Sequence, residues 1–81
     1  MNYFSENLKF LTSKTKINQN QLANKLGIDR QQITRYLKGN EPSYDRLILI
    51  ASIFNLSIDD LLLKDLSKEQ EGDRKWLQNH L

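Results

Sequence analysis

Apolar residues recur at intervals of three and four along most of this chain, which is the spacing of one face of an α-helix. The pattern predicts five helices, at about residues 3–14, 19–26, 30–38, 44–54 and 58–63. No segment alternates between apolar and polar residues, as a half-exposed strand would. We therefore expect an all-α bundle in which each helix turns its apolar stripe inward.

Capping residues mark where several of these helices begin. Three pairs have the spacing of a capping box, in which two side chains satisfy each other's backbone N–H groups: Asn18 with Gln21, Asp29 with Gln32, and Ser57 with Asp60. Ser43 is a further N-cap. Gly27 lies where a helix commonly ends in a left-handed residue, and Pro42 forces a break after the third helix.

The apolar stripes also predict the core. It should contain Leu22, Leu26, Ile33, Leu47, Ile50 and Phe54. Residues 44–54 are apolar on nearly every side, because Ile48, Leu49 and Ile53 flank the main stripe. A helix of this kind is expected at the buried centre of a bundle. Ile28 can fill the gap between the second and third helices.

The outward face of residues 30–38 is polar and carries no acid. Its members are Arg30, Gln31, Gln32, Thr34, Arg35 and Lys38. Ile33, Tyr36 and Leu37 should face inward. Arginine can donate two hydrogen bonds to guanine, and glutamine can pair with adenine, at base edges in the major groove of DNA. This is the chemistry expected of a recognition helix.

Charge is divided unevenly along the chain, although the net charge is only +2. Residues 9–40 contain seven basic residues and one acid, Asp29, which gives +6, and the remainder carries −4. The basic residues in this stretch that precede residue 30 are Lys9, Lys14, Lys16 and Lys25. A basic half suggests a surface for a polyanion, and these lysines are candidates for contacts to phosphates.

Length and composition narrow the classes of function. A chain of 81 residues supports one small domain. The absence of cysteine excludes disulfides and thiolate metal sites and fits a reducing cytoplasm. No apolar run reaches membrane-spanning length, and the first residues lack a signal-peptide pattern. Without a histidine before His80, a glycine-rich phosphate loop or paired carboxylates in a cleft, we expect neither an enzyme nor a bound cofactor or metal.

The segment 65–81 differs in composition from the rest. It has four acids and three bases around Gly72, and Trp76, Leu77 and Leu81 are apolar. We predict a folded domain over residues 1–64 and a tail over 65–81. The tail is either frayed or forms a short extra helix on this domain or on a second subunit.

The run INQNQLANKLGIDRQQITRYLKGNEPSYDRLILIASIFNLSIDDLL resembles the Cro/CI-type repressors, also called the xenobiotic-response-element-like helix-turn-helix regulators. The resemblance covers about residues 4–63 and is carried by Gln19, Leu22-Ala23, Gly27, Ile33, Gly39, Pro42-Ser43 and Leu56-Ser57-Ile58-Asp59. It implies a five-helix fold like that of the lambda repressor. Two positions depart from the family pattern. Leu37 stands where the family often has glutamate, and Glu41 puts an acid in a loop that approaches phosphates.

The resemblance implies a set of DNA contacts. The base-reading candidates are Arg30, Gln31, Gln32, Thr34 and Arg35, with Lys38 beside them. The phosphate-side candidates are Gln19, Asn40, Ser43 and Tyr44. We predict a sequence-specific regulator of double-stranded DNA in the bacterial cytoplasm, of the phage or mobile-element repressor type. The alternative is an antitoxin, or a module held by an antirepressor, that uses the same fold to bind a protein.

The predicted active species is a homodimer on a near-palindromic operator, because one recognition helix reads only a few base pairs. Its surface is expected from the end of the fourth helix through the fifth, where apolar residues exceed what a small core needs. The candidates are Leu56, Ile58, Leu62 and Leu63, with Trp76 and Leu77 in the tail.

Overall fold

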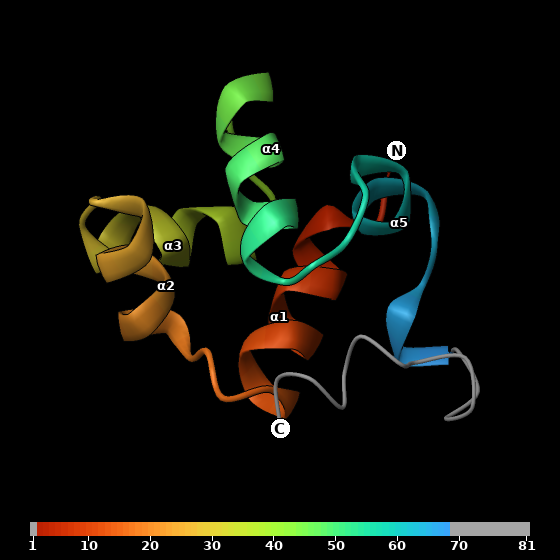
Figure 1. The fold of residues 1–81 in the computed structure, drawn as a ribbon, viewed down its shortest axis with the longest axis horizontal. Coiled ribbons are helices and arrows are strands. Elements are labelled where there is room, and N and C mark those ends of the chain that lie inside the picture. The colour runs from red at the N-terminus through yellow and green to blue at the C-terminus, as the bar shows by residue number, and fades with distance from the viewer. Residues whose placement is uncertain (1, 69–81) are drawn as a thin grey trace.

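The computed structural model describes residues 2–68, and within them all regular structure is helical (Figure 1). The elements are α1 (Phe4–Lys14), α2 (Gln19–Leu26), α3 (Arg30–Leu37), α4 (Tyr44–Ile53), α5 (Ile58–Leu63) and a short 3-10 helix, η1 (Leu66–Lys68). The expected all-α, five-helix fold is confirmed, and each helix begins and ends close to its predicted position. No helix within this described part of the chain is long and apolar enough to cross a membrane.

Two of the predicted capping boxes form. The Asn18 side chain accepts a hydrogen bond from the Gln21 N–H, and the Gln21 side chain accepts one from the Asn18 N–H, both at 2.9 Å. Ser57 and Asp60 make the same reciprocal pair at the start of α5. These bonds satisfy N–H groups that have no partner inside their own helix, so they fix where α2 and α5 begin.

The third predicted box, at the start of α3, is wrong. The Asp29 carboxylate accepts from the Gln31 N–H, at 3.3 Å, and not from Gln32. The Gln32 N–H already donates to the backbone carbonyl of Asp29 at 3.0 Å. The backbone therefore occupies the donor that the box required, and Asp29 caps α3 without help from the Gln32 side chain.

The core is built around α1. Its apolar residues Phe4, Leu8 and Leu11 are buried, and α3, α5 and η1 pack against this helix. Of the predicted core, Leu22, Ile33, Ile50 and Phe54 are confirmed as buried, whereas Leu26 and Leu47 are partly buried at its edge. The helix at the centre of the bundle is thus α1.

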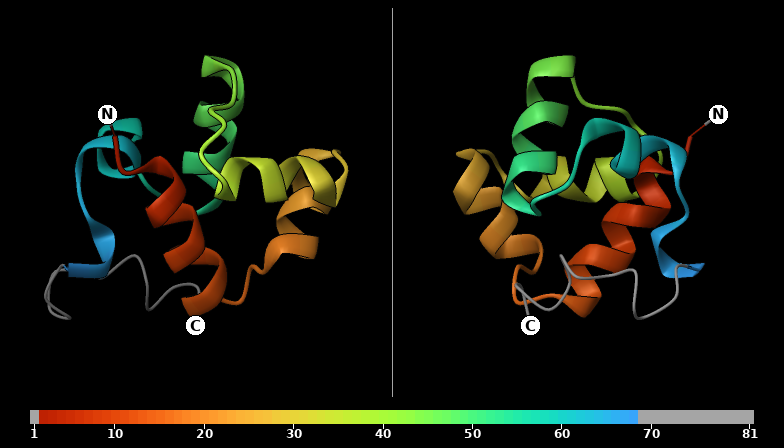
Figure 2. Two further views of the ribbon diagram at one scale, coloured as in Figure 1. Left: turned by 180° about the vertical axis from the view of Figure 1, so that it is seen from behind. Right: turned by 45° about the vertical axis from the view of Figure 1, so that its right-hand side comes forward.

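The expectation that residues 44–54 form the buried centre is wrong. This segment packs through Ile50 and Phe54, while Ile48 is 42% and Leu49 is 53% exposed. The ribbon of the first turns of α4 projects beyond the other helices (Figures 1 and 2), although Arg46 and Leu47 in this part still contact α3 and the core. An apolar composition indicates that a helix can be buried, but it does not determine how many neighbours cover each face.

Asn7 is a buried polar residue that the apolar pattern did not predict. Its side-chain nitrogen donates to the carbonyl oxygens of Leu61 and Lys64, both at 2.7 Å, and its oxygen accepts from the Leu66 N–H at 3.0 Å. The side chain thus satisfies carbonyls at the end of α5 that have no helical partner. Leu66 is 1% exposed and belongs to the core, although the division at residue 64 assigns it to the tail. That division stays a prediction.

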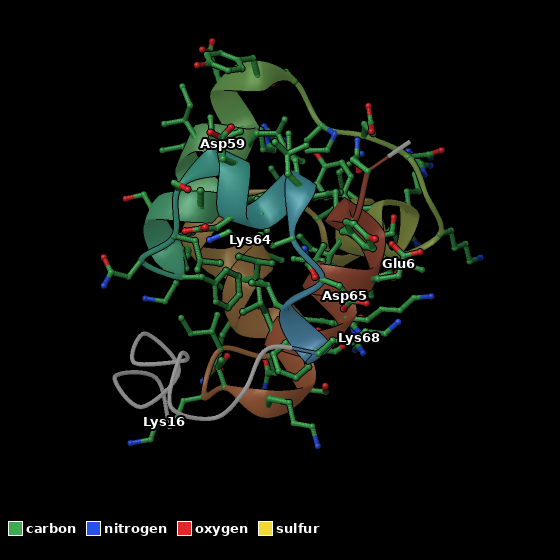
Figure 3. The ribbon with its side chains drawn as sticks, turned by 90° about the vertical axis from the view of Figure 1, so that its right-hand side faces the viewer. Glu6, Lys16, Asp59, Lys64, Asp65 and Lys68 are labelled. Carbon is green, nitrogen blue, oxygen red and sulfur yellow. The ribbon has the colours of Figure 1, made fainter. Side chains whose placement is uncertain are left out.

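Two ion pairs lie between residues 60 and 68, in the same part of the chain. Nζ of Lys64 lies 2.8 Å from Oδ1 of Asp60, and Nζ of Lys68 lies 3.8 Å from Oδ2 of Asp65. Figure 3 shows Lys64, Asp65 and Lys68 along the path from α5 to η1. The hydrogen bond from Lys64, together with those from Ser57, lowers the pKa of the Asp60 carboxyl. Pairs as exposed as these contribute little to stability.

Candidate nucleic-acid interface

The segment from α2 to α3 is fixed by a tight turn. Gly27 ends α2 in the left-handed region, with φ 70°, and its N–H donates to the Asn24 carbonyl at 3.2 Å. The Ile28 N–H donates to the Ala23 carbonyl at 3.0 Å, and the Ile28 side chain packs partly buried against the core, as predicted. Because a side chain at Gly27 would be strained at this φ, the turn depends on glycine. Backbone and core together set the angle between the two helices.

The solvent-facing side of α3 is polar and cationic. Arg30, Gln31, Arg35 and Lys38 are exposed, and Gln32 and Thr34 are half-buried. The ion pairs within residues 2–68 lie elsewhere, on α5 and η1, so no carboxylate neutralises Arg30 or Arg35. The predicted inward set is confirmed for Ile33 and Tyr36, which are 0% and 3% exposed. Five of the six predicted side chains therefore lie on α3 and Lys38 lies at its C-cap, while the Thr34 hydroxyl donates to the Arg30 carbonyl at 3.4 Å.

The residues predicted to lie on the phosphate side flank this helix. Gln19 is half-buried at the first position of α2, and Asn40 and Ser43 are exposed in the loop after α3. Tyr44, at the start of α4, is 68% exposed. The loop turns at Gly39, whose φ is 115°, and the Asn40 N–H donates to a carbonyl of α3 at 3.1 Å. The loop thus leaves α3 in a defined direction.

Glu41, the acid in this loop, is engaged with the start of the chain. Its carboxylate accepts a hydrogen bond from the side-chain amide of Asn2. Both residues line a shallow hollow of about 340 Å³ between α1 and the end of α3, which Lys9 and Lys38 also line. The acid thus lies in a hollow that two lysines also line.

Sequence analysis missed two side chains that hold α3 in place. The Ser5 hydroxyl donates to the Tyr36 carbonyl at 2.7 Å, across 31 residues of sequence. Nη1 of Arg46 donates to the phenol oxygen of Tyr36 at 3.2 Å. Neither pair has a local spacing that predicts it. The sequence does carry one signal for the Arg46 contact. Tyr36 is predicted to be buried, and a buried phenol usually has a hydrogen-bond partner.

The predicted dimer surface is only partly open. Leu63 is 66% exposed, whereas Leu56, Ile58 and Leu62 are partly buried against the core of their own chain. Trp76 and Leu77 lie outside the described residues. Among residues 2–68, other large apolar side chains that are strongly exposed are Tyr3, Tyr44, Ile48 and Leu49. The assignment of a pairing surface stays a prediction.

Comparison with known proteins shows which family and which solved structure this chain is similar to. The sequence model of the helix-turn-helix family matches residues 13–61. A protein of Bacillus subtilis strain 168, named as the uncharacterized HTH-type transcriptional regulator YqaE, is 46% identical over 68 residues, which are 83% of this chain. This chain spans 58% of the length of that relative. The crystal structure of a transcriptional regulator from Listeria innocua is similar with a TM-score of 0.72 and 28% identity, over 98% of this chain and 76% of the other.

Proposed function

We propose, from the premise that this chain belongs to the helix-turn-helix family of DNA-binding transcriptional regulators, that it represses transcription by occupying an operator. In this mechanism α3 lies in the major groove and its polar side chains read base edges. The bound protein covers a promoter and excludes the polymerase. The protein would work in the bacterial cytoplasm, where the DNA is.

The observation that carries the proposal is the acid-free outer side of α3. Arg30 and Arg35 can each make two parallel hydrogen bonds to guanine, and Gln31 can do the same to adenine. Their accessibility, with no carboxylate of the described residues paired to either arginine, supports a polyanionic ligand. Around this helix the phosphate-side candidates Gln19 and Asn40 would fix its register on the duplex without reading sequence.

We further propose that two copies bind one near-palindromic operator. Two recognition helices about 34 Å apart would enter successive major grooves on one face of the duplex. The exposed Leu63 on α5 supports a pairing surface there, with Trp76 and Leu77 as possible extensions. The area available from α5 alone is small, so pairing in solution would be weak and would strengthen when both half-sites are filled.

A second function is favoured by a different observation. Ile48 and Leu49 expose apolar surface on α4. Such a surface suits a protein partner, as an antitoxin or a module controlled by an antirepressor would need. The two functions differ in their response to salt. Binding to duplex DNA weakens steeply as salt is added, whereas binding of an apolar protein surface does not.

The test is selection of bound duplexes from a random pool by the full chain, followed by titration of the winner at several salt concentrations. We expect enrichment of a near-palindromic sequence and a logarithm of the association constant that falls linearly with the logarithm of salt. A scrambled duplex of equal length and composition is the matched control. Failure to enrich any sequence would refute sequence-specific binding and leave the protein-partner alternative.

A further inference from the structure

Tyr36, in the last turn of α3, is held from two directions. On the α1 side its ring meets the ring of Phe4 edge-on, with centroids 6.0 Å apart and planes at 72°, and its carbonyl accepts from the Ser5 hydroxyl. From the α4 side, Nη1 of Arg46 donates to its phenol oxygen at 3.2 Å. The ring itself is 3% exposed. Tyr36 therefore links the base-facing helix to both α1 and α4.

Arg46 contacts both sides of the loop 38–43, which contains the phosphate-side candidates Asn40 and Ser43. Its backbone N–H donates to the Ser43 hydroxyl at 3.3 Å, which caps α4 where the loop ends. Its guanidinium reaches back to Tyr36 in α3, two residues before the loop begins at Lys38. Asn40 lies between these two anchors. A single half-buried arginine thus spans the loop from its last residue to the helix that precedes it.

The packing of α4 explains why this contact matters for geometry. The C-terminal half of α4 is fixed in the core through Ile50 and Ala51. Its N-terminal half exposes Tyr44 and Ile48 and meets the core only through the partly buried Leu47, so apolar packing constrains it less. In both views of Figure 2 this half projects away from the body of the molecule. The hydrogen bond from Arg46 to α3 acts on the half of α4 that has fewer contacts with the core.

We propose that Arg46 is a positioning residue of the DNA interface, which acts through the Tyr36 hydroxyl to set the orientation of the loop 38–43 relative to α3. The base-reading side chains of α3 and the phosphate-side groups of the loop then meet one duplex together. This inference rests on the proposed DNA-binding function. It differs from a direct phosphate contact, because the effect of Arg46 passes through the hydrogen bond from Nη1 to the Tyr36 hydroxyl.

Two substitutions separate these roles. Tyr36→Phe removes only the hydroxyl, and Arg46→Met removes the guanidinium but keeps an apolar stem of similar length. Each is expected to weaken binding to the selected operator about 3- to 10-fold, the effect of losing one hydrogen bond. The double variant should bind the operator as tightly as the single variant with the lower affinity, because both changes break the same contact. Binding to a scrambled duplex should stay unchanged, since it does not need the loop and helix in register.

The salt dependence of DNA affinity distinguishes this role from a direct contact, because loss of a contact between Arg46 and a phosphate would change it. Arg46→Met should leave the slope of log affinity against log salt unchanged. The control is Lys68→Met, which removes one positive charge from η1, on the other side of α1 from α3, and should not alter operator preference. Urea denaturation of each variant establishes that binding is measured on folded protein.

The outcomes distinguish this inference from the proposed function. If the wild-type chain selects no duplex, the proposed function fails. If it selects one and Tyr36→Phe binds it as tightly as the wild type, Arg46 does not act through Tyr36 and the inference is overturned. A slope reduced by about one unit in Arg46→Met, with Tyr36→Phe unaffected, would show a phosphate contact instead. If Arg46→Met is unfolded, the Tyr36→Phe result alone decides.

Discussion

The side-chain oxygen of Asn7 accepts a 3.0 Å hydrogen bond from the backbone N–H of Leu66, and the two residues are 59 positions apart in sequence. Both are buried. The contact ties α1, the central helix, to η1, the last element described. Because the same side chain also bonds two carbonyl oxygens near the end of α5, it fixes the path of the chain from α5 to η1.

Replacing Asn7 with leucine should destabilise the domain strongly. The change leaves the carbonyls of Leu61 and Lys64 and the N–H of Leu66 without their partner, and each buried unpaired group costs about 1–3 kcal/mol. We expect a loss of roughly 2–5 kcal/mol in the free energy of unfolding, measured with urea. The control is Asn24→Leu, at an exposed position of α2. Equal losses in the two variants would mean that the buried hydrogen bonds do not matter.

The position of Leu66 predicts where the chain can be shortened. A chain ending at residue 64 lacks this buried side chain and the N–H that Asn7 binds. A chain ending at residue 68 keeps both. The shorter chain should be less stable by about 2–4 kcal/mol, since losing a buried leucine alone costs on this scale. Identical denaturation midpoints for the two chains would support the predicted domain end at residue 64.

Two neighbours on α4 test the packing of that helix. Ile50→Ala empties a fully buried position and should cost about 2–5 kcal/mol of stability. Leu49→Ala changes a side chain that is 53% exposed and should cost less than about 1 kcal/mol. Chemical denaturation measures both. A large loss at Leu49 would show that this face is covered by a partner or by another part of the chain.

Local signals predicted much of this fold because they act over a few residues. The box at Asn18 and the turn at Gly27 need only their own neighbours, so the sequence indicates them directly. The failure at Asp29 has a local cause too, since a backbone bond took the donor that Gln32 required. Burial of α4 could not be predicted, because exposure of Leu49 depends on which helices reach that face.

Contacts between segments that are distant in the sequence could not be predicted either. The bond from Arg46 to Tyr36 and those made by Asn7 join elements whose relative positions no periodicity gives. The candidate site was easier to predict, because the spacing of polar residues along the sequence is enough to identify the polar face of a helix. Its six side chains were predicted from that pattern, and the structure leaves four of them exposed and Gln32 and Thr34 half-buried. Which bases they contact depends on the docking of the helix and stays a prediction.

Substitutions on α3 and α1 should have different effects on DNA binding. Arg30→Ala or Gln31→Ala should weaken operator binding by about 1–3 kcal/mol and relax preference at one base position. Lys14→Ala, if that lysine reaches a phosphate, should weaken binding to all sequences alike and reduce the salt slope by about one unit. Fluorescence anisotropy with operator and scrambled duplexes separates the two patterns. Unchanged affinity and preference in Arg30→Ala would mean that α3 is not the recognition helix.

The stoichiometry on DNA tests the dimer. One α3 helix reads only a few base pairs, too few to mark a single site in a genome, so two copies should occupy each operator. Sedimentation of the protein–operator complex should give two chains per duplex at saturation, with a footprint that is symmetric about its centre. One chain per duplex with an asymmetric footprint would exclude the two-fold arrangement.

The contribution of each candidate surface follows from two further variants, measured on the same operator. Leu63→Ser removes an exposed apolar side chain from α5 and should lower the cooperativity of the second binding event without changing affinity for an isolated half-site. A chain ending at residue 68 retains η1 and lacks Trp76 and Leu77. If this chain still pairs on DNA and Leu63→Ser does not, the α5 surface is sufficient and the tail is accessory. The reverse result would assign pairing to residues 69–81.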